Sequence, residues 1–183
     1  MHIEVLVEDG SGHRLLEILM PRLLGTHGDP HTWRLIAYKG IGRIPKGLMT
    51  SVDPSKRILL EQLPRLLRGY RRTPSIDLVV VVLDTDNRDC AKFLQELKTV
   101  AKVCKSEDIA LFRLDVEEIE AWHLGDRKAL LAAYPRAKQG VFDCYVQDSA
   151  CGTWELLADM LYPGGSAALK KTGWPLPGQV KHE

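Results

Sequence analysis

The sequence predicts an α/β fold, in which a mostly parallel sheet of about four strands is flanked by helices. Strand-like and helix-like segments alternate four times between residues 3 and 117, and such alternation is typical of parallel βαβ units. Residues 79–83 (VVVVL) are all apolar, as expected of a central strand that is buried on both faces. A chain of 183 residues that is 45% hydrophobic can bury one such core and a small appendage.

The first half of the sheet is predicted from two strands and two helices. Residues 3–7 (IEVLV) favour a strand, because β-branched side chains suit a pleated, half-buried surface. Residues 13–25 have helical apolar spacing, with Gly25 as the stop signal. Residues 32–38 (TWRLIAY) predict the second strand, and residues 55–70 predict an amphipathic helix.

The second half repeats the pattern and then becomes helical. A strand is predicted over residues 75–86 (SIDLVVVVLDTD), a helix over 91–105 and a strand over 109–117 (IALFRLDVE). We therefore expect an α/β domain over residues 1–125, with a helical C-terminal extension, residues 126–183, packed on the same domain.

The net charge, the cysteine spacing and the length of the apolar runs exclude several classes of protein. The net charge of +1 excludes a polycation that binds nucleic acid through its overall charge, although a local basic face is compatible with it. The four cysteines form no CxxC pair, no charged leader precedes an apolar N-terminal segment, and no apolar run is long enough to span a membrane. These features predict a cytoplasmic protein with free thiols.

Three of the predicted strands end in acidic residues. These are Glu8, followed by Asp9, for the first strand, Asp84 and Asp86 for the third, and Asp115, Glu117 and Glu118 for the fourth. Asp84 and Asp86 are two residues apart, so on an extended chain their side chains point the same way. Glu8 joins them if the first and third strands are neighbours, as doubly wound sheets often allow. Carboxylates at one sheet edge repel one another unless a cation lies among them, and Mg²⁺ prefers oxygen ligands. The pattern favours a Mg²⁺ or Mn²⁺ site.

The alternative interpretation is that these aspartates only form a polar turn after the strand. For Asp89 we prefer that interpretation, because Asp89 directly precedes a predicted helix and aspartate is a common N-cap. For Asp84 and Asp86 the presence of Glu8 at the end of another strand favours metal ligation.

A glutamate after the first strand (VLVEDGSG) and a DxD motif after an apolar strand (VVVVLDTD) resemble the Toprim domain over about residues 1–125. This is the Rossmann-like, Mg²⁺-binding α/β module of topoisomerases, primases and OLD-type nucleases. Residues 113–135 and 148–165 resemble a narrower group of small bacterial Toprim-like proteins, which are often encoded beside an ATPase in defence-type gene pairs.

The resemblance implies roles for particular residues. Glu8 would be a general acid/base or a metal ligand, and Asp84 and Asp86 would bind Mg²⁺. Glu118 and Glu120, within EEIEAW, match the third acidic element of the family, although the same stretch also suits a helix start with Trp122 in its buried stripe.

The sequence departs from the nuclease branch at one position. Those nucleases often carry a further acidic residue four positions after the first glutamate, and here that position is Gly12. A full two-metal site is therefore not implied.

A glycine-rich basic loop follows the second strand. Residues 38–47 (YKGIGRIPKG) place Lys39, Arg43 and Lys46 between glycines. Glycines let a backbone approach phosphate closely, and the cations would attract it, so the loop is a candidate nucleic-acid contact. The alternative is a solvated surface loop with no ligand.

Three hypotheses about function follow. The first is a Mg²⁺-dependent (or Mn²⁺-dependent) phosphodiesterase that acts on DNA or RNA in a bacterial defence or DNA-processing system. The second is a non-catalytic Toprim-like subunit that regulates or binds a partner ATPase. The third is a phosphatase with Asp84 as an aspartyl nucleophile, which ranks lowest because that motif usually lies on the first strand of its fold.

Overall fold

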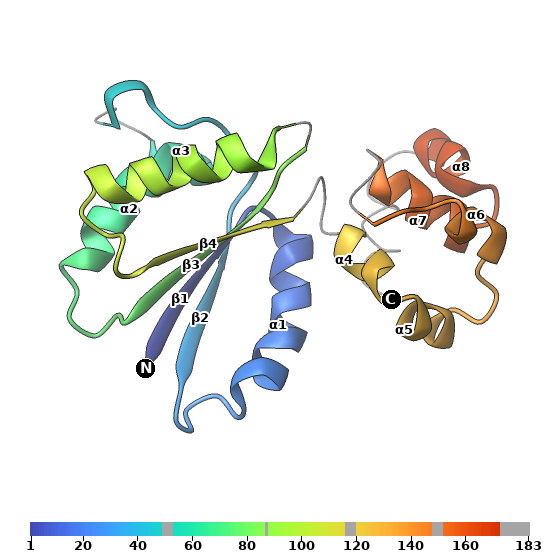
Figure 1. Ribbon diagram of the computed structural model, residues 1–183, viewed down its shortest axis with the longest axis horizontal. Helices are drawn as coiled ribbons and strands as arrows, with labels where there is room; N and C mark the ends of the chain where they lie inside the picture. The colour runs from blue at the N-terminus through green and yellow to red at the C-terminus, as the bar shows by residue number, and fades with distance from the viewer. Residues whose placement is uncertain (49–52, 87, 116–119, 148–151, 173–183) are drawn as a thin grey trace. The chain divides into compact units, whose positions relative to one another are not determined.

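The computed structural model describes residues 1–48, 53–86, 88–115, 120–147 and 152–172 (Figure 1). The chain forms two compact units. One contains residues 1–83 and 89–114, and the other contains residues 84–88 and the chain from residue 115 onward.

The first unit is built on a four-stranded parallel sheet with the strand order β2-β1-β3-β4. The predicted α/β fold class is therefore confirmed. The pairing is in register along the strands, so that Val5 of β1 lies opposite Leu35 of β2 on one side and Val80 of β3 on the other. The strands are β1 (His2–Val7), β2 (Thr32–Ala37), β3 (Leu78–Asp84) and β4 (Ala110–Asp115).

Helices cover both faces of this sheet. Helix α1 (Gly10–Leu24) lies on one face, and α2 (Leu59–Arg71) and α3 (Cys90–Val103) lie on the other (Figure 1). Two short 3-10 helices, η1 (Lys46–Leu48) and η2 (Pro54–Lys56), lie between β2 and α2.

Each face has its own apolar core, and β3 contributes to both. Val79 and Val81 pack in the core under α2 and α3, whereas Val82 packs in the core under α1. Residues 79–83 were predicted to form a strand that is buried on both faces, and this is confirmed. The burial of alternate residues on opposite faces follows from the two-residue period of a strand.

Local signals set where the helices begin and end. Helix α1 begins at Gly10, because Asp9 caps it by accepting a hydrogen bond from the Gly12 N–H at 2.9 Å. It ends at Gly25, which has a φ of 86° that glycine adopts readily. Asp89 caps α3 through the Lys92 N–H at 2.9 Å, as predicted.

The second unit contains five helices in the described ranges, which pack on a small core of Leu124, Leu130, Phe142, Leu157 and Met160. They are α4 (Glu120–Gly125), α5 (Arg127–Ala133), α6 (Gln139–Asp143), α7 (Thr153–Leu161) and α8 (Gly165–Thr172). Among the helices of the described residues, none combines the length and the apolar character that a membrane span requires.

Candidate functional site

The strand order makes the carboxyl ends of β1 and β3 neighbours. Val7, the last residue of β1, pairs with Val82, two residues before β3 ends at Asp84. Glu8 directly follows β1. The first and third strands are thus adjacent, which was the condition for Glu8 to lie near the aspartates.

The same two strands form the point where the chain order of the sheet reverses. From β1 the chain continues to β2 on one side, and β3 and β4 follow on the other side. In open α/β sheets, ligands usually bind beyond the carboxyl ends of the strands at such a switch point. Glu8 and Asp84 are therefore at the positions of the sheet where a ligand site is most expected.

Asp86 does not lie on the strand, so the predicted strand over residues 75–86 is too long at its C-terminal end. β3 ends at Asp84, and the N–H of buried Thr85 donates to the Asp115 carbonyl at 2.9 Å. Asp86 then adopts a left-handed φ of 48°, which aspartate tolerates in turns. The alternation of an extended chain, from which we inferred that Asp84 and Asp86 point the same way, does not apply here.

The carboxylate of Asp86 has a cationic neighbour within the same turn. Its Oδ2 lies 3.3 Å from Nη1 of Arg88, and the side chain is 54% exposed. Exposed ion pairs of this kind contribute little to stability. The turn interpretation therefore holds for the backbone of Asp86, while its carboxylate is still accessible to a solute.

The loop after β2 begins beside Glu8. The carbonyl of Val7 accepts a hydrogen bond from the Tyr38 N–H at 2.9 Å, and the carbonyl of Glu8 accepts one from the Gly40 N–H at 3.1 Å. These bonds continue the pairing of β1 with β2 past the strand ends. The start of the basic loop and Glu8 are thereby held at the same edge of the sheet.

The glycines of this loop serve the packing of the loop on α2. The carbonyls of Gly40 and Ile41 accept hydrogen bonds from the N–H groups of Leu59 and Leu60, at 3.1 and 2.9 Å. Helix α2 has no side-chain cap, so these carbonyls satisfy N–H groups that a bound anion would otherwise use. A Cβ at Gly42, which has a φ of 68°, would collide with Ile58. The loop is consequently not a backbone cradle for phosphate at the N-terminus of α2.

The cations of the loop nevertheless face solvent. Lys39, Arg43 and Lys46 are all exposed. Within the described ranges, their side chains form no hydrogen bond and no ion pair. Any contact that this loop makes with phosphate would therefore come from side-chain charge and not from backbone N–H groups.

Of the third acidic element, the structure describes only part. Glu118 lies outside the described residues, and Glu120 begins α4 with 2% of its side chain exposed. The buried side of α4 consists of Glu120, Ala121 and Leu124, whereas Trp122 is 36% exposed. The expectation that Trp122 lies in the core is therefore wrong. Glu120, Ala121 and Leu124 form the buried side of this short helix, and Trp122 lies outside that side.

The chemistry of the acidic residues fits a hard divalent cation. In the described part of the chain, no three or more Asp, Glu, His or Cys side chains converge as a metal site. Mg²⁺, however, is usually held by one or two carboxylates while it keeps waters and phosphate oxygens as its other ligands. Glu8 and Asp84 supply donors of this kind, so they are the residues that would hold Mg²⁺ or Mn²⁺.

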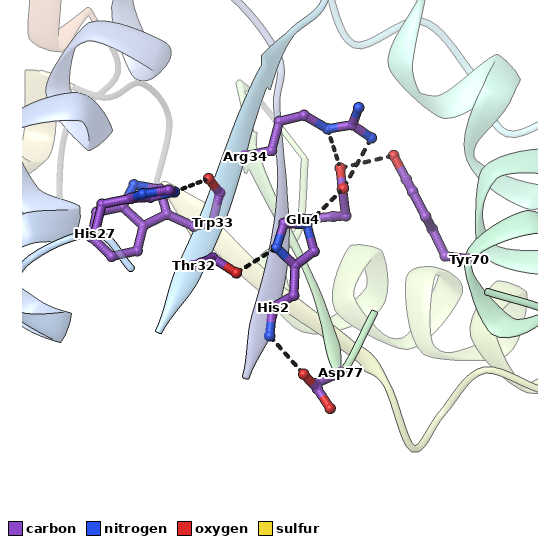
Figure 2. A network of polar contacts seen from close by, with 8 residues as sticks. All are labelled: His2, Glu4, His27, Thr32, Trp33, Arg34, Tyr70 and Asp77. Atoms are coloured by element: carbon purple, nitrogen blue, oxygen red, sulfur yellow. Dashed lines mark hydrogen bonds and ion pairs between the residues drawn. The ribbon is translucent and has the colours of Figure 1, made fainter. Parts of the chain in front are cut away.

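The structure also contains a buried polar network that was not predicted, centred on Glu4 in β1 (Figure 2). Glu4 is 2% exposed and forms a bidentate ion pair with Arg34. Nη2 of Arg34 lies 2.9 Å from Oε1 of Glu4, and Nε of Arg34 lies 3.0 Å from Oε2. Tyr70 of α2 donates its hydroxyl to Oε2 at 3.4 Å, and His2 Nε2 lies 3.2 Å from Oε1. Both carboxylate oxygens are therefore occupied.

This network stabilises the packing of β1, β2 and α2. Bidentate arginine–carboxylate pairs are among the stronger hydrogen-bonded contacts, and a buried carboxylate requires such partners. Burial, followed by the charge of Glu4, raises the pKa of Tyr70, which keeps its hydroxyl protonated as a donor. The hydrogen bond to Glu4 raises the pKa of Arg34. Because every group is committed to a partner, we assign the network to structure and not to catalysis.

A sequence signal for this network exists. Glu4 and Arg34 are opposite each other in the register of β1 and β2. Two opposite charges at facing positions of two largely apolar strands predict a cross-strand pair. The signal becomes readable only once the pairing of the strands is known.

Comparison with known proteins adds no neighbour to this description. No protein-family model, no curated protein and no solved structure matches the chain. The α/β fold and its switch point accordingly rest on the geometry described above.

The network predicts that two arginines of similar exposure differ in their effect on stability. Arg34 is 61% exposed and pairs with buried Glu4, whereas Arg14 is 59% exposed and pairs with exposed Glu17. Arg34→Met should lower the free energy of unfolding by about 3 kcal/mol, because it leaves a buried carboxylate with too few partners. Arg14→Met should change it by less than about 0.5 kcal/mol. Urea denaturation measures both, and equal effects of the two substitutions would contradict the role given to Glu4.

Proposed function

We propose that this chain is a Toprim-like, Mg²⁺-dependent phosphodiesterase that acts on nucleic acid. The observation that best supports the proposal is the adjacency of β1 and β3, which end at Glu8 and Asp84 at the switch point of the sheet. A second support is the loop with Lys39, Arg43 and Lys46, whose first residues are hydrogen-bonded to the backbone at Glu8.

Each part of this site has a role in the proposed reaction. The bound cation would neutralise charge on the scissile phosphate and lower the pKa of a water. Asp84 would hold the cation together with Glu8, and Glu8 would also move a proton between the attacking water and the leaving oxygen. Lys39, Arg43 and Lys46 bind the phosphate backbone beside the scissile bond.

The proposal also covers the wider acidic set and the cellular setting. Asp86 would be a further ligand of the cation at Asp84, and Glu118 and Glu120 are the residues from which any second metal position would be built. We place the activity in the bacterial cytoplasm, in a defence or DNA-processing system, as the resemblance to small Toprim-like proteins implies. The four cysteines without a CxxC pair agree with a reducing compartment.

A second candidate is a non-catalytic subunit that regulates a partner ATPase. Two observations favour it. Gly12, at the position where related nucleases often carry an acid, is buried in the first turn of α1, with its N–H bonded to Asp9. Asp86 lies in a turn beside Arg88 and not on the strand.

We expect Glu8→Gln and Asp84→Asn each to reduce Mg²⁺-dependent or Mn²⁺-dependent cleavage of plasmid DNA or RNA by at least about a hundredfold. Both variants should remain folded, because each keeps the size and shape of the side chain and removes only its charge, and circular dichroism checks this. The matched control is Glu96→Gln, an exposed acid on α3 that should leave cleavage unchanged. If the wild-type protein cleaves neither DNA nor RNA, alone or with a partner ATPase, the phosphodiesterase proposal is wrong.

The basic loop makes a separate prediction about binding. Lys39→Ala, Arg43→Ala and Lys46→Ala should each weaken the binding of single- or double-stranded oligonucleotides of any sequence. Each should also lower the slope of log K against log salt concentration by about 0.7 to 0.9. Lys92→Ala, a change of an exposed lysine on α3, is the control. Anisotropy titrations at several salt concentrations measure both quantities, and unchanged slopes would show that the loop contacts no phosphate.

The two candidate functions differ in what Asp84→Asn does to a partner ATPase. The regulatory function predicts that the wild type and Asp84→Asn change the ATP hydrolysis rate of the partner equally, since no step requires the acid. The phosphodiesterase predicts loss of cleavage in Asp84→Asn whatever happens to ATP hydrolysis. Measuring both rates in one reaction separates the two.

A further inference from the structure

β4 lies at the end of the strand order and has a strand neighbour on one side only among the strands that the structure describes. Two hydrogen bonds show which of its residues face that neighbour. The Val79 N–H donates to the Ile109 carbonyl at 2.7 Å, and the Thr85 N–H donates to the Asp115 carbonyl at 2.9 Å. Successive residues of a strand present their N–H and C=O groups to alternate sides. The odd-numbered residues of β4 therefore face β3, and the even-numbered residues face outward.

The outward-facing residues are Ala110, Phe112 and Leu114. The Ala110 N–H donates to the carbonyl of Ser106, in the turn before the strand, at 2.9 Å. The Phe112 carbonyl accepts from Nη1 of Arg113 at 3.1 Å, a local contact that a strand partner could share or replace. Such an edge can pair with a further extended segment. This pairing causes aggregation when it is uncontrolled, and it is also how proteins bind peptides by β-strand addition.

A groove runs between this edge and α3. Its volume is about 510 Å³, within the range of ligand sites in proteins. Its floor is apolar and includes Leu94 and Ala101 of α3 with Ala110 and Phe112 of β4. The apolar floor and the strand edge thus lie in one place, so a segment pairing with β4 would bury side chains against α3.

The rim of the groove is cationic. Lys98, Lys102 and Arg113 line it, and Glu107 is the one acid among its lining residues. Lys98 and Lys102 are one helical turn apart, so their ammonium groups are neighbours and repel each other. Within the described part of the chain, neither lysine forms an ion pair.

We propose that this groove binds an extended segment of a partner protein in which acidic and apolar residues alternate, paired as an additional strand with β4. Alternate side chains of a strand point to opposite faces. The apolar set then lies on Leu94 and Phe112, on the side of α3. The acidic set points to the opposite face, where Arg113 lies, and Lys98 and Lys102 add to the positive potential around the same groove. Main-chain hydrogen bonds to Phe112 and Leu114 give affinity, and the charges give the preference for acidic residues.

Two other occupants fit these features less well. A second copy paired across a two-fold axis would bring identical patches together, and with them Lys98, Lys102 and Arg113 of both copies. That arrangement places like charges opposite each other. Nucleic acid would use the cations but would leave the strand edge and the apolar floor without a role.

The test uses the full chain and two fluorescent peptides, one in which glutamate alternates with valine and one in which lysine alternates with valine. We expect saturable binding of the glutamate peptide below about 1 mM and no binding of the lysine peptide in anisotropy titrations. Hydrogen exchange measured by NMR should show that the glutamate peptide protects the Phe112 and Leu114 amides. Absence of binding, equal binding of both peptides, or protection elsewhere would overturn the proposal.

Charge-reversing variants test the rim. Lys98→Glu/Lys102→Glu should weaken the binding of the glutamate peptide by about tenfold or more, whereas Lys92→Glu, on the same helix but outside the groove, should not. If the double variant does not fold, Lys98→Gln/Lys102→Gln replaces it, and the expected loss of affinity for the glutamate peptide is smaller. Unchanged affinity would contradict the proposal. Two other results would also contradict the proposal. One is protection of the Phe112 and Leu114 amides by self-association of the protein without peptide. The other is an oligonucleotide that binds at the same amides and displaces the peptide.

Discussion

The pairing of β1 with β2 on one side and with β3 on the other is the constraint on which the rest of the structure depends. It places the chain reversal of the sheet at β1, and it makes the strand ends at Glu8 and Asp84 neighbours. The buried pair of Glu4 and Arg34 ties β1 to β2 in one register. A shift by one residue would separate this pair and turn the apolar side chains of β1 to the wrong faces. Stability and the proposed site therefore rely on the same register.

Features encoded by neighbouring residues could be predicted from the sequence. The apolar run at 79–83, the stop at Gly25 and the cap at Asp89 each depend on local patterning, and the structure has all three. The adjacency of β1 and β3 was stated only as a condition, because strand order is a long-range property. The Glu4 network was missed for the same reason. Asp86 was misread because β3 already ends at Asp84 and Asp86 has a left-handed φ in the following turn, and aspartate is compatible with both conformations.

The backbone of the basic loop packs on α2, while its charged side chains stay exposed to solvent and to any ligand. Its backbone carbonyls cap α2, and its glycines allow the close approach to that helix. Its three cations remain exposed. The groove beside β4 lies at the far end of the strand order from β2, between β4 and α3. Variants of Lys98 and Lys102 can consequently be made without touching Glu8 or the loop.

The central claim is that Glu8 and Asp84 hold one divalent cation at the switch point. Mn²⁺ is paramagnetic and broadens the NMR signals of nearby amides, so a titration followed by amide spectra tests the claim directly. The account predicts that substoichiometric Mn²⁺ broadens the amides around Glu8 and around Asp84 together, that excess Mg²⁺ reverses the broadening, and that Glu8→Gln or Asp84→Asn abolishes it. Broadening at only one of the two strand ends, or broadening that survives both substitutions, would contradict it.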